Sequence, residues 1–305
     1  MRVIRDLSQI QLQQATVVSI GAFDGLHLGH RQLLMQLVRR ARRTQRLSAV
    51  LTFDPLPRAV LAPESNTTCL MSTEDKIQLL EAWGLDIAVL LSFTAALAST
   101  SARDFVQLLC RHLHMTELWV GWDFALGRGR GGDVAALQRL GRTMGFDVQV
   151  VKPVREGDVV ISSTEIRQLI AAGRVREAAE MLGRYHEVRG VVIRGDQRGR
   201  ELGFPTANLD VSAHCAVPGG GVYAAYASIS GTSYPAVANI GTRPTFGHSE
   251  PTLEVHVLGL DQDIYGQEII VQFVERLRAE RRFGSRQALS AQITEDIARA
   301  REILQ

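Results

Sequence analysis

Two histidines lie where a predicted strand meets a predicted helix, and their spacing indicates a phosphate site. The stretch GAFDGLHLGH, residues 21–30, follows the apolar run 17–20. His27 and His30 are three residues apart at the start of a helix expected over 31–43, so their imidazoles can share one face. A helix N-terminus offers unpaired N–H groups and a partial positive charge. The two imidazoles therefore extend a surface that attracts anions.

Three glycines in the same stretch support this interpretation. Gly21, Gly25 and Gly29 would let a ligand approach the backbone closely, which suits a polyphosphate. Phosphoryl and nucleotidyl transfer depend mainly on positioning and charge neutralisation, so few other catalytic groups are needed. The alternative is a transition metal bound by the two histidines near Asp24, but the sequence shows no third and fourth ligand.

The stretch ISSTEIR is a second candidate for phosphate binding. Ser162, Ser163 and Thr164 place three hydroxyls in a row, and Arg167 follows one helical turn later. The alternative is purely structural, because Ser162 and Glu165 have the spacing of a helix capping box. The sequence alone leaves both interpretations open.

Two basic stretches have weaker implications. The loop GRGRGG matches a dinucleotide-binding pattern at Gly127, Gly129 and Gly132, but it follows the fourth predicted strand and is crowded with arginine. We interpret it as a mobile basic loop over nucleotide phosphates. The run RRARRTQR at 39–46 is expected to be the solvated face and C-terminal end of a helix, where cations suit the helix dipole.

In the second half, the segment Pro205-Thr206-Ala207-Asn208 is a candidate metal site. Pro205 fixes the backbone that enters the segment. Thr206 and Asn208 are two residues apart, so in an extended chain their side chains point the same way. A hydroxyl and an amide oxygen on one face can complete a Mg²⁺ shell shared with phosphates. The alternative is a simple turn, because Gly, Pro and Asn are common in loops.

Glu254 is a candidate general base in the strictly alternating strand 253–257. Leu253, Val255 and Val257 take one face of that strand, and Glu254 and His256 take the other. A carboxylate in this position can accept the proton of an attacking hydroxyl. Considered alone, Glu254 fits an ordinary solvent-facing strand residue better.

The elements that must position the first-half motifs alternate between strand and helix. Five apolar, β-branched runs predict strands buried on both faces, with helical patterns between them: 16–20, 47–53, 86–93, 117–122 and 147–151. This alternation predicts an α/β fold, a doubly wound parallel sheet covered by helices. Because ligands collect at the carboxyl edge of such a sheet, the motifs that follow its strands are expected to converge there.

The second half has the pattern of a small antiparallel β-barrel. Short alternating runs separated by Gly and Pro follow residue 184, and an amphipathic helix is expected over 285–304. We therefore predict two domains, residues 1–184 and 185–305. A chain of 305 residues is long enough for both.

Composition excludes several classes of protein. The net charge of +2 gives no sign of a nucleic-acid or anionic-lipid partner, and no apolar stretch is long enough to span a bilayer. Three cysteines without a metal-binding spacing, and an N-terminus without a secretory apolar run, predict a cytoplasmic protein. The sequence does not indicate an oligomeric state.

The motifs of the first half resemble a known family. GAFDGLHLGH and SSTEIR are similar to the nucleotidyltransferase superfamily with an H-x-G-H signature. Together with TFDPLPR and VGWDFALGRGRGGD, they resemble the FMN adenylyltransferase module of bifunctional bacterial FAD synthetases. The resemblance implies catalytic roles for His27, His30 and Arg167, and flavin contacts at Phe53, Asp54 and Pro55. It implies ATP or phosphate contacts at Gly21, Phe23, Asp24, Gly25, Gly29, Asp123, Ser162, Ser163 and Thr164.

The second half resembles the riboflavin kinase module of the same family. The resemblance rests on GRELGFPTANL, GVYAAY, VANIGTRPT, LEVHVL and DIYGQEIIVQFVERLRAERRF. It implies that Thr206 and Asn208 bind magnesium, that Glu254 is the catalytic base and that Phe204 contacts the flavin. It also implies that the loop with Gly195, Arg198 and Gly199 closes over the nucleotide.

The implied function is flavin-cofactor synthesis. The chain would phosphorylate riboflavin to FMN with ATP and Mg²⁺, and then adenylylate FMN to FAD with release of pyrophosphate. Three positions depart from the family pattern: Leu56 stands where a histidine is frequent, Leu126 where an aromatic is frequent, and Gly259 where an acid is usual. None of them removes a residue with an assigned chemical role.

Two rival functions remain open on sequence grounds. The first half alone fits a transferase for another phosphorylated acceptor, such as pantetheine phosphate or nicotinamide mononucleotide, although the barrel half does not. A second rival is an RNA-binding protein, prompted by the arginine-rich stretches. The near-neutral charge and the lack of aromatics between those arginines argue against it.

Overall fold

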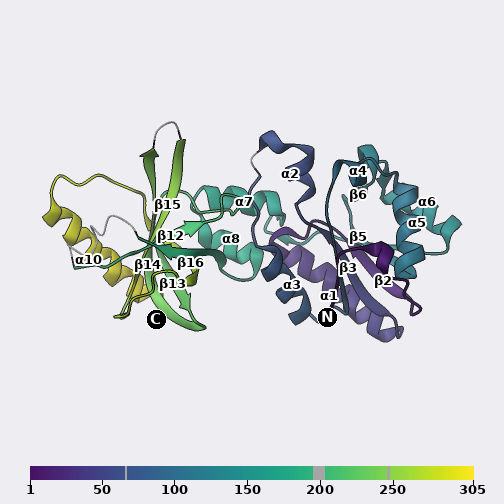
Figure 1. Cartoon of the computed structure of the whole chain (residues 1–305), viewed down its shortest axis with the longest axis horizontal. Helices are drawn as coiled ribbons and strands as arrows, with labels where there is room; N and C mark the ends of the chain where they lie inside the picture. The colour runs from purple at the N-terminus through teal and green to yellow at the C-terminus, as the bar shows by residue number, and fades with distance from the viewer. Residues whose placement is uncertain (66, 195–202, 246–247) are drawn as a thin grey trace. The chain divides into compact units, whose positions relative to one another are not determined.

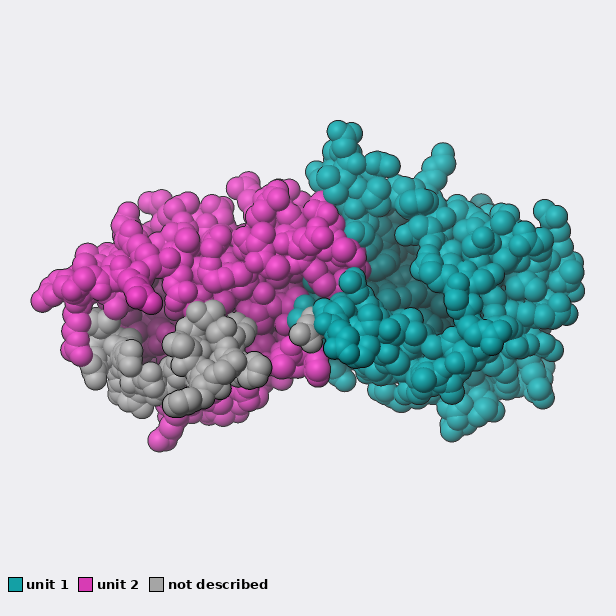
Figure 2. Space-filling view, turned by 90° about the horizontal axis from the view of Figure 1, so that it is seen from above, with its two compact units in different colours: residues 1–162 teal, residues 163–305 magenta. Residues whose placement is uncertain are grey.

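The chain folds into two compact units, residues 1–162 and 163–305 (Figures 1 and 2). The structure is a computed structural model that describes residues 1–65, 67–194, 203–245 and 248–305. The predicted α/β sheet forms the core of the first unit, and the predicted barrel forms the core of the second. The fold class expected from the sequence is therefore confirmed.

A six-stranded sheet forms the centre of the first unit, with the strand order β1-β4-β3-β2-β5-β8 and parallel pairing throughout. Its strands are β1 (Arg2–Ile4), β2 (Thr16–Ile20), β3 (Leu47–Phe53), β4 (Ile87–Leu91), β5 (Met115–Gly121) and β8 (Asp147–Val151). Five of them match the predicted runs to within a few residues, but β8 is a mostly exposed edge strand and is not buried on both faces as predicted. The edge strand β1 was not predicted, because three residues are too few to show an alternating pattern.

Helices cover both faces of this sheet (Figure 1). On one face lie α1 (Leu28–Arg43) and α3 (Thr73–Ala82), and on the other lie α5 (Ala102–Leu113) and α6 (Val134–Met144). Side chains of Ser72, Ser101 and Asp133 cap α3, α5 and α6 by accepting a backbone N–H of the first turn. The remaining short elements are η1 (Leu7–Gln9), η2 (Asp24–Leu26), α2 (Pro57–Leu61), η3 (Pro63–Ser65), α4 (Ala95–Ala98), β6 (Ala125–Leu126), η4 (Arg128–Arg130), β7 (Gly132–Asp133), β9 (Arg155–Glu156) and β10 (Val159–Val160).

The strand order places the switch point of the sheet between β2 and β5. From β2 the chain moves outward through β3 and β4, whereas β5 and β8 lie on the other side of β2. Elements that follow carboxyl ends of strands, namely α2, α4 and β6, lie together at the top of the first unit in Figure 1. Figure 2, viewed from that side, shows the surface of this unit hollowed. Ligands of open α/β sheets bind at such a switch point.

The second unit contains a closed barrel with the strand order β11-β12-β15-β14-β13-β16. Its strands are β11 (His186–Ile193), β12 (Ala207–Val211), β13 (Gly221–Ile229), β14 (Thr232–Thr245), β15 (His248–Val257) and β16 (Glu268–Arg278). Every pair in it is antiparallel. Alternate residues, such as Leu253, Val255 and Val257, fill its interior.

Two helices that the sequence assigns to the first domain belong to the second compact unit. These are α7 (Ser163–Ala171) and α8 (Val175–Leu182). Val175 of α8 is part of the barrel's apolar core, and the N–H of Gly219 donates to the carbonyl of Ile170. The compact units thus divide the chain at 162/163, earlier than the change of sequence pattern at 184/185. The two positions differ because α8 buries its apolar side chain Val175 in the barrel core, whereas its helical sequence pattern continues that of the first half.

The C-terminal helix α10 (Arg286–Ile303) packs on the outside of the barrel, close to its expected bounds. Leu304 and Ala300 are buried against the outward residues Val222 and Leu277. Asp296, which is buried, accepts bidentate hydrogen bonds from Arg278 at 2.8–3.0 Å. A buried ion pair of this geometry fixes the register of the helix on the barrel.

A buried histidine makes the stability of the second unit depend on pH. His186 is 1% exposed, and its Nε2–H donates to the carbonyl of Ala216 at 2.6 Å. Burial, against a smaller opposing effect of that hydrogen bond, lowers the pKa of His186 to about 4. The unfolded chain therefore binds a proton that the folded chain excludes. The stabilisation is complete above about pH 6.5 and is lost as the pH falls towards 4.

We predict that lowering the pH from 7 to 5 reduces the free energy of unfolding of the wild type by about 2 kcal/mol more than that of His186→Gln. The variant has no imidazole to protonate, and other titrating groups affect both proteins alike. Urea unfolding at a series of pH values measures the difference. Parallel pH profiles for the two proteins would contradict the prediction.

Candidate active sites

The turn between β2 and α1 holds residues in conformations that few side chains adopt. Phe23 and Leu26 have φ of 46° and 39°, and Gly25 has φ of 75°. A non-glycine residue in the left-handed region costs on the order of 1 kcal/mol. Here the side chains of Phe23 and Leu26 are buried in the apolar core, which offsets that cost. Backbone outliers of this kind cluster at functional sites, and this turn lies at the switch point of the sheet.

His27 ends the turn and is the N-cap of α1. Its Nδ1 accepts a long hydrogen bond of 3.4 Å from the backbone N–H of His30. The two imidazole rings are stacked, with centroids 3.7 Å apart and planes 19° apart, and Phe23 packs edge-on against His30 at 5.1 Å. The helix therefore begins three residues earlier than expected, and the histidines share one face as their spacing predicts.

The imidazole of His30 has an unsatisfied polar atom. Its Nδ1 is buried and has no hydrogen-bond partner among the described residues. Burial, together with the charges of His27 and Lys76, lowers the pKa of His30 well below its usual value, so the ring is neutral at pH 7. A buried polar atom without a partner costs free energy until a ligand or water satisfies it. A neutral imidazole at a helix N-terminus can donate this hydrogen bond to an anion.

Lys76 is a buried cation beneath the turn that the sequence analysis missed. It is 2% exposed, and its Nζ donates to the carbonyl of Ala22 at 3.1 Å. The hydroxyl of Thr52 donates to the same carbonyl at 2.9 Å. Burial lowers the pKa of Lys76, against the opposing charges of Asp24 and Asp54. Only two of the 34 basic residues are lysines, Lys76 and Lys152. A lysine within a predicted helix is therefore unusual in this chain, and this was the one feature of the sequence that could have drawn attention to Lys76.

Several predicted phosphate-binding residues have structural contacts in this turn. Asp24 is buried, and both its oxygens accept from the N–H of Leu70, at 3.0 and 3.2 Å. A Cβ at Gly21 would lie 3.1 Å from the ring of Phe23, and a Cβ at Gly29 would lie 3.1 Å from the imidazole of His27. These two glycines thus make room for side chains of the turn itself. Their contact with a ligand stays a prediction.

The predicted flavin contacts follow β3. The ring of Phe53 packs edge-on against Phe93 with centroids 5.3 Å apart. Asp54 is exposed and accepts a hydrogen bond of 3.0 Å from the hydroxyl of Thr73, and the Asp54–Pro55 peptide is cis. All three predicted residues therefore lie at the carboxyl end of a strand next to β2.

The basic loop after β5 is attached to the rest of the unit. The N–H of Arg128 donates to the carbonyl of Thr100, and the guanidinium of Arg130 donates to the carbonyl of Asp123 at 3.0 Å. A Cβ at Gly127, where φ is 75°, would lie 2.5 Å from the backbone of Ala102. The loop therefore forms a hairpin that packs against the segment around Ala102. It follows β5 and leads into α6, so it is not the first turn of a dinucleotide fold. Its interpretation as a mobile loop over nucleotide phosphates stays a prediction. A role for exposed Asp123 in phosphate binding stays a prediction.

The serine-rich motif spans the division between the compact units. Ser162 is the last residue of the first unit, whereas Ser163, Thr164 and Arg167 lie in α7 of the second. The guanidinium of Arg167 donates to the carbonyl of Ser163 at 3.2 Å, one helical turn away. The proposed cooperation of these residues with the two histidines stays a prediction.

In the barrel, the structure brings the predicted metal ligand and the predicted base together. Asn208 of β12 is the direct cross-strand partner of Glu254 of β15. Side chains of directly opposed residues lie on the same face, with Cβ atoms about 5 Å apart. Both are half-buried, and Glu254 also lies opposite Asn239 of β14. A carboxylate between two amide side chains is thus positioned at the barrel surface.

His256 anchors the segment that leads into β12. Its Nδ1–H donates to the carbonyl of Pro205 at 2.7 Å, and its ring meets Phe204 edge-on with centroids 6.0 Å apart. His256 shares its strand face with Glu254, so one strand holds the candidate base and fixes the Thr206 segment beside it. The alternation of 253–257 contained this information, but no role had been assigned to His256. Gly195, Arg198 and Gly199 lie outside the described residues.

The three departures from the family pattern have local explanations or contacts. Gly259 has φ of 76°, in the left-handed region that favours glycine over an acidic side chain. Leu126 packs against the apolar core of the first unit, and Leu56 precedes the short helix α2.

In the described part of the chain, no group of three or more His, Cys, Asp and Glu side chains could hold a metal ion.

Comparison with known proteins identifies the family. A family model for FAD synthetase matches residues 9–165, and a model for riboflavin kinase matches residues 182–304. A bifunctional riboflavin kinase/FMN adenylyltransferase of Escherichia coli is 39% identical over 303 residues, which cover 99% of this chain and 96% of that protein. One from Bacillus subtilis is 34% identical, with 93% and 91% coverage.

The chain belongs to the family of bifunctional riboflavin kinase/FMN adenylyltransferases. It is a transferase that phosphorylates riboflavin to FMN and adenylylates FMN to FAD, with ATP as co-substrate. The family match decides against the other phosphorylated acceptors that the first half left open.

A solved structure supports the fold across both units. A protein from Streptococcus pneumoniae, described as a macrolide-efflux protein, superposes with a TM-score of 0.89 at 30% identity and 98% coverage of both chains. None of the helices in the described part of this chain combines the length and hydropathy needed to cross a bilayer.

For this family member, we predict that Lys76→Met slows FMN adenylylation roughly tenfold to a hundredfold, because a charged hydrogen bond to the turn is lost. Riboflavin phosphorylation in the same chain serves as the internal control and should not change. Separate assays with riboflavin and with supplied FMN measure the two rates. Equal rates for the variant and wild type with FMN would contradict a role for Lys76.

Proposed function

We propose that the β2–α1 turn is the adenylyl-transfer site and that the facing pair of β12 and β15 is the riboflavin kinase site. The observation that most strongly supports the first assignment is the buried Nδ1 of His30 without a partner among the described residues. It lies at the N-terminus of a 16-residue helix, stacked on a second imidazole. Such a site favours a negatively charged ligand.

At the first site, FMN supplies its own nucleophile. A phosphate oxygen of FMN, already ionised at neutral pH, attacks the α-phosphorus of ATP. The bond from that phosphorus to the α–β bridging oxygen breaks, and pyrophosphate leaves. No general base is needed, so the site requires hydrogen-bond donors more than carboxylates. His27 and His30 would stabilise the negative charge that develops on the bridging oxygen.

Other residues would complete this site. Ser162, Ser163, Thr164 and Arg167 would bind ATP phosphates, and Asp123 would contact the same ligand. Phe53, Asp54 and Pro55 would border the flavin, since they follow the strand next to β2. Lys76 would act as a positioning residue, because its ammonium holds the carbonyl of Ala22 and not a ligand atom.

At the second site, Glu254 would act as general base. Its carboxylate accepts the proton of the ribityl 5′-hydroxyl of riboflavin as that oxygen attacks the γ-phosphorus of ATP. The bond from the γ-phosphorus to the β–γ bridging oxygen breaks, and ADP leaves. Phe204 would pack on the flavin, and Gly195, Arg198 and Gly199 would contribute to nucleotide binding. The half-buried position of Glu254 opposite Asn208 supports this role.

The oxygen donors beside Glu254 fit Mg²⁺. The hydroxyl of Thr206 and the amide oxygen of Asn208 are hard ligands, and Mg²⁺ takes few protein ligands while keeping several waters. When bound, the ion would screen the phosphate charges of ATP. His256 would keep Thr206 in place through its hydrogen bond to Pro205.

For the two functional modules, we propose the division that the sequence predicts, with adenylylation in residues 1–184 and riboflavin phosphorylation in residues 185–305.

We predict that two variants stop the reaction at different points. His27→Asn keeps a side-chain acceptor for the helix cap but loses the imidazole, so FMN should accumulate and FAD formation should fall about tenfold or more. Glu254→Gln should lower FMN formation about a hundredfold or more and leave adenylylation of supplied FMN unchanged. Chromatography of the flavins formed from riboflavin and MgATP, with and without added FMN, measures both effects.

Normal FAD output from His27→Asn would mean that His27 serves only as a helix cap. Equal loss of both activities in Glu254→Gln would show that the two sites are not independent. Failure of wild-type protein to form either FMN or FAD would contradict the function itself.

A further inference from the structure

The arginine-rich end of α1 is more than a solvated helix face. Glu117 of β5 is 1% exposed and accepts hydrogen bonds of 2.7–3.1 Å from Arg40 and 2.7 Å from Arg46. The indole N–H of Trp119 donates to the same carboxylate at 3.1 Å. Burial alone would raise the pKa of Glu117, but the hydrogen bonds and charges around it lower the pKa below its usual value. One buried carboxylate thus fixes two guanidinium groups and an aromatic ring.

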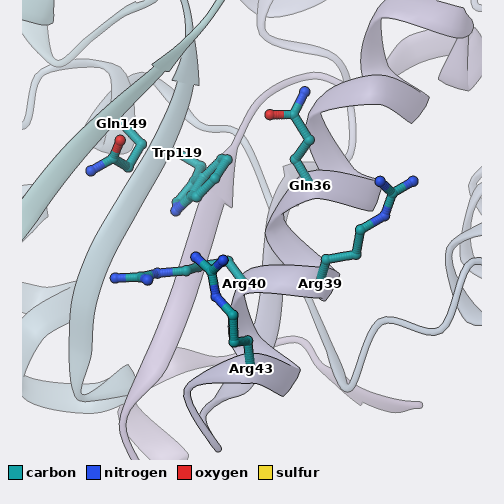
Figure 3. Close-up of a pocket in the computed structure, with 6 residues that line it drawn as sticks. All are labelled: Gln36, Arg39, Arg40, Arg43, Trp119 and Gln149. Carbon is teal, nitrogen blue, oxygen red and sulfur yellow. The ribbon is translucent and has the colours of Figure 1, made fainter.

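A hollow of about 420 Å³ lies beside this cluster, and we call it the α1–β5 pocket. It is lined by Gln36, Arg39, Arg40, Arg43, Trp119 and Gln149. Figure 3 shows the indole of Trp119 between Gln149 on one side and Gln36 on the other, with the guanidinium groups of Arg40 and Arg43 beneath it. Arg39 lies farther out on the helix. The volume is within the range of small-molecule sites, which is roughly 300–1,000 Å³.

The pocket has an excess of positive charge. Glu117 neutralises part of the charge of Arg40 and Arg46, and Asp147 also interacts with Arg40. Among the described residues, no acidic side chain forms an ion pair with Arg39 or Arg43, and both are exposed. The C-terminal end of a helix does not attract anions by its dipole. Any attraction must therefore come from these arginines.

The pocket is separate from the adenylyl-transfer site. Arg40 comes ten residues after His30 on the same helix, which is about 15 Å along its axis. Trp119 and Gln149 lie within β5 and β8 and not in the loops that follow their carboxyl ends. None of the residues that line the pocket has a role in either proposed reaction.

We propose that the α1–β5 pocket binds a nucleotide. An indole face offers a platform on which a planar heterocycle stacks, and guanidinium groups are the preferred partners of phosphate. Gln36 and Gln149 each carry a donor and an acceptor for the polar edges of a base. Arg43, which faces the ring without an acidic partner in the described part of the chain, supplies the main phosphate contact.

The same chemistry occurs in free nucleotides and in single-stranded RNA, and the pocket favours the free nucleotide. Its lining contains one aromatic side chain, that of Trp119, whereas proteins that bind single strands stack successive bases on several aromatic side chains. The net charge of the whole chain is only +2, which gives little general attraction for a polyanion.

The indole N–H resonance of Trp119 in the full-length protein tests this proposal, with adenosine 5′-monophosphate as the probe. The chain has three tryptophans, and Trp119→Phe assigns the signal. We expect a saturable shift of the Trp119 signal, with an affinity that Arg43→Ala weakens roughly tenfold or more. Arg42→Ala is the matched control, because Arg42 is on the same helix but outside the pocket lining, and it should leave the affinity unchanged. Unchanged indole signals of Trp83 and Trp122 in the variants confirm that they are folded.

Three further ligands separate the possible sources of binding. Adenosine should bind at least about tenfold more weakly than the monophosphate, and inorganic phosphate alone should give no saturable shift of Trp119. An RNA of eight nucleotides should not bind more tightly than the monophosphate. An unmoved Trp119 signal, an equal affinity in Arg43→Ala, an equal response to phosphate alone or much tighter binding of the RNA would each overturn the proposal.

Discussion

The arrangement of the proposed site in the first unit depends on the tight turn that connects β2 to α1. The chain leaves a fully buried strand at Ile20 and starts a helix at Leu28. It does so with three residues in the left-handed region and with a histidine as helix cap. Burial of Phe23 and Leu26 in the apolar core offsets the cost of these conformations. The same turn stacks the two imidazoles and leaves one buried nitrogen without a partner in the described structure.

The two proposed sites would address phosphate charge in different ways. In the first unit, the proposed donors are the imidazoles of His27 and His30 at the N-terminus of α1, and burial, together with the charges of His27 and Lys76, lowers the pKa of His30 well below its usual value. In the barrel, the groups are oxygen atoms on facing strands, which suit a divalent cation and a proton acceptor. A transfer in which the nucleophile is already ionised needs no base, whereas a ribityl hydroxyl does. The residue types proposed for each site fit that difference.

The sequence predicts the parts of this molecule that are periodic. Five of the six strands of the parallel sheet, the main helices and the alternation of residues 253–257 are visible in it, because burial on one or two faces repeats along most of these elements. Residues that act through tertiary contacts cannot be recognised from the sequence pattern. Lys76 is hidden in an ordinary helix pattern, and His256 is adjacent to Pro205 only in the folded barrel. Glu117 is the third example, because a lone acid in an apolar strand gives no sign that two arginines and an indole converge on it. The packing of α8 on the barrel is also a property of the fold and not of its sequence pattern.

A crystal structure of the protein with a non-hydrolysable ATP analogue, FMN and Mg²⁺ tests the central claim most directly. The account predicts phosphate oxygens within hydrogen-bond distance of the imidazoles of His27 and His30 at the start of α1. A nucleotide bound elsewhere in the first unit, with the Nδ1 of His30 still lacking a partner, would contradict it.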